Sequence, residues 1–127
     1  MWMTLILVAA GGALGASARW TTRLAIERLF DSNFPIATFA ANVGGSLAMG
    51  VAFSLLTGDA AGNSKLPPFL IVGFLGGYTT FSAYALDAWT LFAEGRTLEA
   101  LTYAIGSAVL SIAALAAGIA LARGIVS

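Results

Sequence analysis

The residues best suited to chemistry lie in one stretch, Gly-Gly-Tyr-Thr-Thr-Phe-Ser-Ala-Tyr at positions 76–84. The stretch interrupts an apolar segment with two glycines, two threonines and spaced aromatic rings. A helix weakened inside a bilayer frees backbone polar groups, which lipid tolerates only where protein or a wet cavity covers them. Phe81 and Tyr84 share one helix face, and the edges of aromatic rings carry partial positive charge. We therefore predict a helix break and a polar site here.

A row of hydroxyl groups is expected on the last apolar segment. Tyr103, Ser107 and Ser111 recur every four residues. In a helix they share one face and make a row roughly 12 Å long, given a rise of about 1.5 Å per residue. Serine in a membrane helix often bonds back to its own i−4 carbonyl. The row is therefore either a local feature of the helix or a track of donors, and both interpretations remain open.

Two other polar side chains fall within or near the apolar segments. Asn42 carries an amide whose unpaired burial would cost about 1–3 kcal/mol, so it either joins two helices or donates to a passing solute. Arg19 is the most embedded charge. It either snorkels to the interface beside Trp20 or acts as a fixed positive charge that draws anions towards a vestibule.

The residues that are missing narrow the chemistry. The chain has no His and no Cys, so the usual metal ligands, the usual neutral-pH acid–base group and the thiol nucleophile are absent. We expect no catalytic residues and no enzyme. No Asp or Glu lies in mid-membrane unless Asp87 counts, whereas proton-coupled exporters generally need such a group. Donors without a central carboxylate favour a passive pathway for a small anion.

The composition predicts the scaffold that positions these residues. Of 127 residues, 59% are hydrophobic and 9% are charged, against about 25% charged in ordinary soluble domains. The net charge is zero, so nothing suggests a nucleic acid as partner. We predict an all-α membrane protein, with one domain over residues 1–127 and a broken third helix. The four expected spans are about Thr4 to the low twenties, Pro35–Thr57, Pro67–Ala93 and Leu98–Ala122.

The positive charges do not choose one orientation in the membrane. Lys65 and Arg123 are expected on the side of the termini, and Arg28 and Arg96 on the other side, with Arg23 as a third there if it snorkels that way. Because this balance is even, the positive-inside rule sets no single topology. Chains inserted both ways would pair antiparallel, although other features of the sequence can still select one topology.

Small residues recur at four-residue spacing and are expected to let helices approach closely in lipid. A unit of this size is also too small to enclose much of a pathway alone, so we expect a dimer. The repeating positions are Gly11 and Gly15, Gly12 and Ala16, Asn42, Ser46 and Gly50, and Ala114, Gly118 and Ala122.

Three motifs together resemble the Fluc (CrcB-type) fluoride channels. They are G-x-x-G-A-x-x-R-W at 12–20, N-x-G-G at 42–45 and G-G-x-T-T-F-S at 76–82, of which the third is the most specific. The resemblance covers the whole chain. It implies a small four-helix protein of the bacterial inner membrane that forms an antiparallel dual-topology dimer with two pores. It also implies passive, selective fluoride export that gives resistance to fluoride.

The resemblance also implies roles for individual residues. Phe81 would belong to an aromatic box in the pore, and the backbone carbonyls of Gly76 and Thr79 would hold a structural sodium ion at the dimer centre. The implied pore or anion-binding residues are Arg19, Asn42, Thr80, Phe81, Tyr84, Tyr103, Ser107 and Ser111.

Some positions depart from the family pattern. The second box phenylalanine is Tyr84, the family's T-F-S repeat reads Ala-Tyr-Ala at 83–85, and the usual Glu is Asp87. The Tyr84 hydroxyl would bind the anion more tightly, slow it, or satisfy a neighbouring group. A homodimer is expected, but some family members are heterodimers, so a paralogous partner remains open.

Two other functions are alternatives to a fluoride channel. A small proton-coupled multidrug exporter with dual topology would need a membrane-embedded Glu in the first span, and the sequence has none there. A structural or assembly subunit without transport activity would leave the cell's fluoride sensitivity unchanged when lost.

Overall fold

Four helical crossings make up the described part of the chain. The computed structural model describes residues 1–57, 62 and 64–126, and all regular elements within them are helical. Four helical stretches in this part are long and apolar enough to span a membrane, which confirms an integral membrane protein with four spans. The elements are α1 Trp2–Leu29, α2 Ile36–Leu56, the π-helix η2 Pro68–Leu75, α3 Gly76–Tyr78, α4 Phe81–Ala93 and α5 Thr97–Val126.

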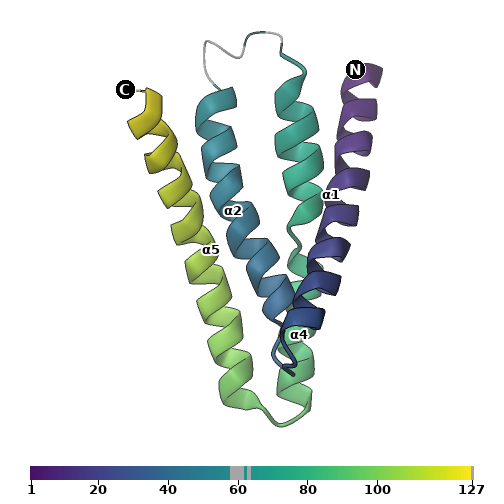
Figure 1. The fold of residues 1–127 in the computed structure, drawn as a ribbon, viewed down its shortest axis with the longest axis vertical. Helices are drawn as coiled ribbons and strands as arrows, with labels where there is room; N and C mark the ends of the chain where they lie inside the picture. The colour runs from purple at the N-terminus through teal and green to yellow at the C-terminus, as the bar shows by residue number, and fades with distance from the viewer. Residues whose placement is uncertain (58–61, 63, 127) are drawn as a thin grey trace.

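The helices form two main packing pairs. α2 packs chiefly against α5, while α1 packs against η2 and α3. The two chain ends lie at one end of the bundle, and the connection from α4 to α5 lies at the other (Figure 1). The even number of crossings therefore places both termini on the same side of the bundle, as expected. The polar loop expected at Gly58–Lys65 lies mostly outside the described residues.

The first helix is longer than expected. It continues past the low twenties to Leu29, at the end that carries charged residues. Arg23 donates to Glu27 one turn later, at 2.7 Å, and such i,i+4 pairs favour helix in exposed segments.

A tight turn joins α4 to α5 at Glu94–Arg96. Gly95 has a φ of 79°, in the left-handed region that favours glycine. Arg96 pairs with Glu94 and Glu99 and donates to the backbone carbonyl of Asn33 at 3.1 Å. The hydrogen bond to Glu99 raises the pKa of Arg96 above its usual value. This guanidinium therefore stays charged and ties the turn to the segment before α2.

Close backbone contact holds α2 and α5 together, as the spacing of small residues predicts. A Cβ atom placed on Gly50 would lie 2.1 Å from the carbonyl oxygen of Leu115, and one on Gly118 would lie 2.2 Å from that of Leu47. Only a residue without a side chain fits at either position. The hydrophobic effect supplies no attraction between helices in lipid, so this close approach supplies the packing.

The third crossing is broken, but not at its glycines. Gly76 is helical, with φ −63° and ψ −36°, whereas Thr79 and Thr80 are extended, with ψ of 158° and 127°. The break predicted within residues 76–84 is therefore confirmed, and inside that stretch it lies at the two threonines. A Cβ on Gly77 would lie 2.7 Å from the carbonyl oxygen of Gly12, so this glycine allows close contact with α1 instead.

Gly118→Ala is expected to lower the stability of the bundle. The added methyl group overlaps the Leu47 carbonyl, and overpacking of this kind costs about 1–3 kcal/mol. Thermal unfolding in detergent should show a clear fall in Tm. Gly124→Ala, on the same helix, is the control because its Cβ would meet nothing within 4 Å. Equal Tm values for the two variants would contradict the close approach of α2 and α5.

Candidate functional site

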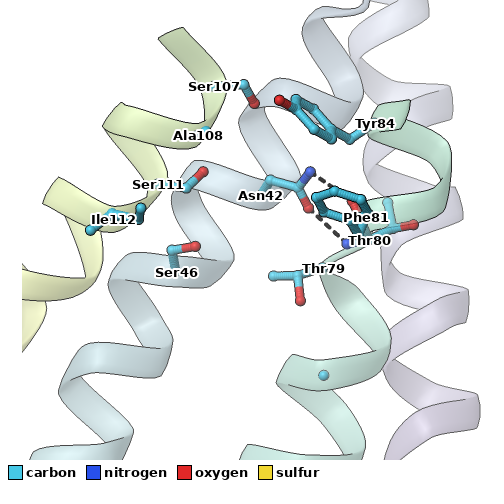
Figure 2. Close-up of a pocket in the computed structure, with 11 residues that line it drawn as sticks. Asn42, Ser46, Thr79, Thr80, Phe81, Tyr84, Ser107, Ala108, Ser111 and Ile112 are labelled. Atoms are coloured by element: carbon cyan, nitrogen blue, oxygen red, sulfur yellow. Dashed lines mark hydrogen bonds between the residues drawn. The ribbon is translucent and has the colours of Figure 1, made fainter. Parts of the chain in front are cut away.

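The break in the third crossing is held by the side chain of Asn42 from α2. The Asn42 Nδ2 group donates to the carbonyl of Thr80 at 2.9 Å, and the Thr80 amide donates to Asn42 Oδ1 at 2.7 Å (Figure 2). One side-chain amide thus satisfies both backbone polar groups of an extended residue in the middle of the bundle. Asn42 therefore joins two helices, and one of its two N–H donors stays unused by this pairing.

This pairing changes the hydrogen bonding on both sides of the break. The Thr80 amide is the i+4 donor that the Gly76 carbonyl would have in a continuous helix, and it is bonded to Asn42 instead. Thr79 has an extended ψ, so its carbonyl leaves the helical ladder. On the other side, the Thr80 hydroxyl caps α4 by accepting from the amide of Ala83 at 3.2 Å. The break is thus capped on one side, and on the other side the last carbonyls of the helix, from Gly76 to Thr79, lose their i+4 donors.

A cavity of about 380 Å³ opens beside the break, between α2, α5 and the third crossing. It brings together most of the residues selected from the sequence, and no carboxylate lines it. Its walls are Asn42, Ser46, Gly76, Thr79, Thr80, Phe81, Tyr84, Ser107, Ala108, Ser111 and Ile112. Two of the selected residues, Arg19 and Tyr103, are not among them.

The serine hydroxyls in this cavity have no hydrogen-bond partner in the part of the chain that the structure describes. Ser17 and several threonines elsewhere donate back to their i−4 carbonyls, as is common in membrane helices. Among the described residues, no side-chain hydrogen bond is made by Ser46, Ser107 or Ser111, and the Ser111 Oγ atom is buried without a partner. The row on α5 is therefore not explained by local back-bonding, at least for Ser107 and Ser111.

Ser46 lines the cavity, whereas its spacing in the sequence predicts a small residue at a helix interface. The sequence feature that could have placed Ser46 at the cavity is its spacing from Asn42. Ser46 lies four residues after Asn42 and therefore on the same face of α2. The spacing fits either role, and only the cavity distinguishes them.

The hydroxyl of Tyr84 is engaged with the backbone of α5. It donates to the carbonyl of Ala104 at 2.5 Å, while the ring lies 5.3 Å from Phe81 and 5.5 Å from Tyr103, between centroids. Of the three possibilities left open, this bond favours the third, in which the hydroxyl satisfies a neighbour. The ring is thereby fixed as a wall of the cavity.

Tyr103 lies in the core rather than at the cavity. Its side chain is 1% exposed and packs edge-on against Phe34, with Leu91 nearby. Its hydroxyl donates to a carboxylate oxygen of Asp87 at 3.3 Å. The hydroxyl row expected on α5 is therefore divided, since its first member faces the protein interior and the other two face the cavity.

Phe81 projects away from the chain. It stands at the start of α4, immediately after the break, and is 80% exposed although it lies within a membrane-spanning crossing. The Phe81 ring, which lines the cavity, is thus also exposed on the outer surface of the helix bundle.

Arg19 lies beside a second cavity, of about 210 Å³, on the other side of Thr80. Trp20, Arg23 and Thr38 also line it. Arg23 is paired with Glu27 and lies 5.5 Å above the Trp20 ring, whereas Arg19 makes no ion pair with any described residue. A positive charge therefore stands next to the break without a carboxylate to neutralise it, which is compatible with both interpretations of Arg19.

Comparison with known proteins gives consistent matches over nearly the whole chain. The family described as CrcB-like protein, Camphor Resistance (CrcB), matches residues 6–119. A protein of Paracoccus denitrificans named fluoride-specific ion channel FluC is 47% identical over 122 residues, which are 96% of each chain. Proteins with the same name from Cereibacter sphaeroides and Hahella chejuensis are 48% and 40% identical, over 95% and 94% of each chain.

Asn42→Leu is expected to destabilise the protein through the break. Leucine keeps a similar volume but leaves the N–H and C=O groups of Thr80 unpaired, and each unpaired buried group costs about 1–3 kcal/mol. Thermal unfolding should show a markedly lower Tm. Asn33→Leu, at an exposed position outside the helices, is the matched control. If both variants unfold alike, Asn42 does not hold the break.

Proposed function

Because this chain belongs to the CrcB-like family, we propose that it is a fluoride-specific ion channel that exports fluoride passively and so gives resistance to it. The observation that carries the proposal is the cavity beside the break. Unused serine hydroxyls and an amide line it without any carboxylate. Such a lining offers hydrogen-bond donors to an anion and repels none.

The chemistry of fluoride fits these donors. Fluoride is small and tightly hydrated, so a pore must replace its water shell with donors, as potassium filters do with carbonyl oxygens for their cation. Ser107, Ser111 and the second N–H of Asn42 offer hydroxyl and amide donors at the cavity. The edge of the Phe81 ring adds partial positive charge without a strong bond, so that the ion can move on.

Passive transport fits better than proton coupling. A proton-coupled exporter would exchange protons for substrate at an acidic group in the membrane, and the cavity has none. The relatives are named for fluoride channels and not for drug export. The multidrug exporter is therefore not supported, and the function proposed is transport without enzymatic chemistry.

The proposed working unit is a dimer of antiparallel chains in the bacterial inner membrane. The cavity is open on the side to which the largely exposed Phe81 ring projects, so a second chain would complete its wall. The even distribution of positive charges allows a chain to insert in either orientation. A second copy of this chain is the proposed partner, and a paralogue would serve the same purpose.

A structural sodium ion at the centre of that dimer is part of the proposal. The oxygen atoms suited to it are the backbone carbonyls of Gly76 and Thr79, which the break removes from the helical ladder. Hard cations prefer such oxygen ligands, and a two-fold axis would double the two carbonyls of one chain to four. The ion would hold the two chains together.

Liposomes that contain the purified protein should release fluoride far faster than chloride. Phe81→Ile should abolish the flux while the dimer stays assembled, because the substitution removes a ring edge from the cavity wall. The flux is followed with a fluoride-selective electrode, and assembly by size-exclusion chromatography. Phe92→Ile, on the same helix and away from the cavity, should conduct normally.

Two results would contradict this assignment. Equal rates for fluoride and chloride would remove the selectivity, and undiminished flux in Phe81→Ile would remove that residue from the pathway.

Replacing sodium with a large organic cation on both sides of the membrane should weaken the dimer and reduce the flux. The proposed reason is that only a small cation fits between backbone carbonyls. The dimer is measured by chemical cross-linking, which reports assembly independently of transport. A dimer and a flux that are indifferent to the replacement would argue against the central ion.

A further inference from the structure

Tyr78, the last helical residue before the break, is tied to α1 through its side chain. Its hydroxyl oxygen lies 2.8 Å from the Oγ1 atom of Thr22. The Thr22 hydroxyl already donates its one hydrogen to the carbonyl of Ala18, at 3.0 Å. Tyr78 is therefore the donor, and a short chain of hydrogen bonds runs from Tyr78 through Thr22 to the backbone of α1.

Of residues 76–79, all within the described part of the chain, Tyr78 alone has a side chain that is hydrogen-bonded to another crossing. The two glycines have no side chain to offer. The amide and the hydroxyl of Thr79 both donate to the carbonyl of Leu75, at 3.1 and 3.0 Å, and so stay within the third crossing. The side-chain hydrogen bond that joins this turn to a neighbouring helix therefore comes from Tyr78.

Packing on two sides restricts the position of Tyr78. Its ring is stacked parallel to that of Phe74, with centroids 6.3 Å apart and an angle of 2° between the planes. Towards α2, a Cβ atom placed on Gly45 would lie 3.1 Å from the ring and 2.5 Å from Cγ2 of Thr79. Towards α1, a Cβ atom on Gly15 would lie 2.9 Å from the Tyr78 amide nitrogen. The residue is thus held between α1 and α2 with little room to move.

The same turn carries the carbonyls of the proposed ion site. The Thr79 carbonyl shares a planar trans peptide unit with the Thr80 amide, whose N–H is bonded to Asn42 Oδ1 (Figure 2). The carbonyl therefore points away from Asn42. Asn42 fixes one end of this peptide from α2, and Tyr78, the residue before it, is fixed from α1. Two helices thus hold the break from its two sides.

We propose that Tyr78, through its hydrogen bond to Thr22, is a positioning residue for the sodium site at the dimer centre. This inference rests on the central ion of the proposed function. Tyr78 does not touch the ion; it limits the movement of the turn that presents the carbonyls of Gly76 and Thr79. A more rigid set of oxygen ligands binds a small cation more tightly and rejects a larger one better, because selectivity among hard cations depends on cavity size and flexibility.

Tyr78→Phe is the direct test, because it keeps the ring and removes the hydroxyl. No donor is left unpaired, since the Thr22 hydrogen still goes to Ala18. The dimer is followed by chemical cross-linking in detergent while a large organic cation replaces sodium at constant ionic strength. The sodium concentration that gives half-maximal dimer should rise about fivefold, as expected for the loss of one hydrogen bond. Potassium should support the wild-type dimer poorly and the variant dimer better.

Variants at Thr22 test whether the effect passes through this one bond. Thr22→Val removes the acceptor and should raise the sodium requirement as well, whereas Thr22→Ser keeps the hydroxyl and should match the wild type. Adding Tyr78→Phe to Thr22→Val should raise the requirement no further, because the bond is already lost. Thr21→Val is the matched control, since the Thr21 hydroxyl is exposed and donates to the carbonyl of Ser17 on its own helix.

The outcomes separate this inference from the proposed function. A wild-type dimer that is indifferent to sodium would contradict the central ion, and this inference with it. A sodium-dependent wild type with the same requirement in Tyr78→Phe would overturn the positioning role alone. A lower Tm with an unchanged sodium requirement would overturn it too, since the bond would then stabilise only the fold. Absence of fluoride flux from a wild type whose dimer needs sodium would contradict the proposed transport, while the sodium comparison still decides the role of Tyr78.

Discussion

The pairing of Asn42 with Thr80 is the interaction on which the rest of the site depends. An extended residue inside a membrane-spanning crossing has an N–H and a C=O group that lipid cannot satisfy, and the amide of Asn42 satisfies both. Because the Thr80 amide is used in this way, the helix cannot continue through it. The break is therefore not a weak point of the chain but a stabilised conformation that α2 supplies with hydrogen bonds.

The break decides where polar groups face within the membrane. It removes the carbonyls of Gly76 to Thr79 from the helical ladder, and it lets α4 start anew with Phe81 directed away from the chain. The cavity lies beside the break, and beyond it α2 and α5 are in close backbone contact at Gly50 and Gly118. Serine hydroxyls that face this space have no carbonyl partner, and this leaves them available to an anion. The tethered ring of Tyr84 completes the wall without contributing a free donor.

The sequence predicted the number and type of the helices better than the exact residues of the break and of the cavity wall. Four spans, common placement of the termini and a broken third helix follow from apolar segments about 20 residues long and from a polar stretch within one of them. The sequence placed the break within residues 76–84 but not at one residue, because a glycine can either weaken a helix or allow close approach, and Gly77 does the second against Gly12. Ser46 is ambiguous in the sequence for a similar reason. A small side chain at four-residue spacing fits a helix interface and a cavity equally well.

By itself, the sequence determined that the chain spans a membrane four times and that hydroxyl and amide groups outnumber acids there, since composition and periodicity fix which groups lie at membrane depth. Only the tertiary structure decided which of those groups are already used. Tyr84 and Tyr103 give their hydroxyls to Ala104 and Asp87, whereas Ser107 and Ser111 keep theirs. Local spacing cannot distinguish these cases, because the partner of each hydroxyl lies on another part of the chain. Helix packing decides which donors are available. It therefore also decides where an anion can pass.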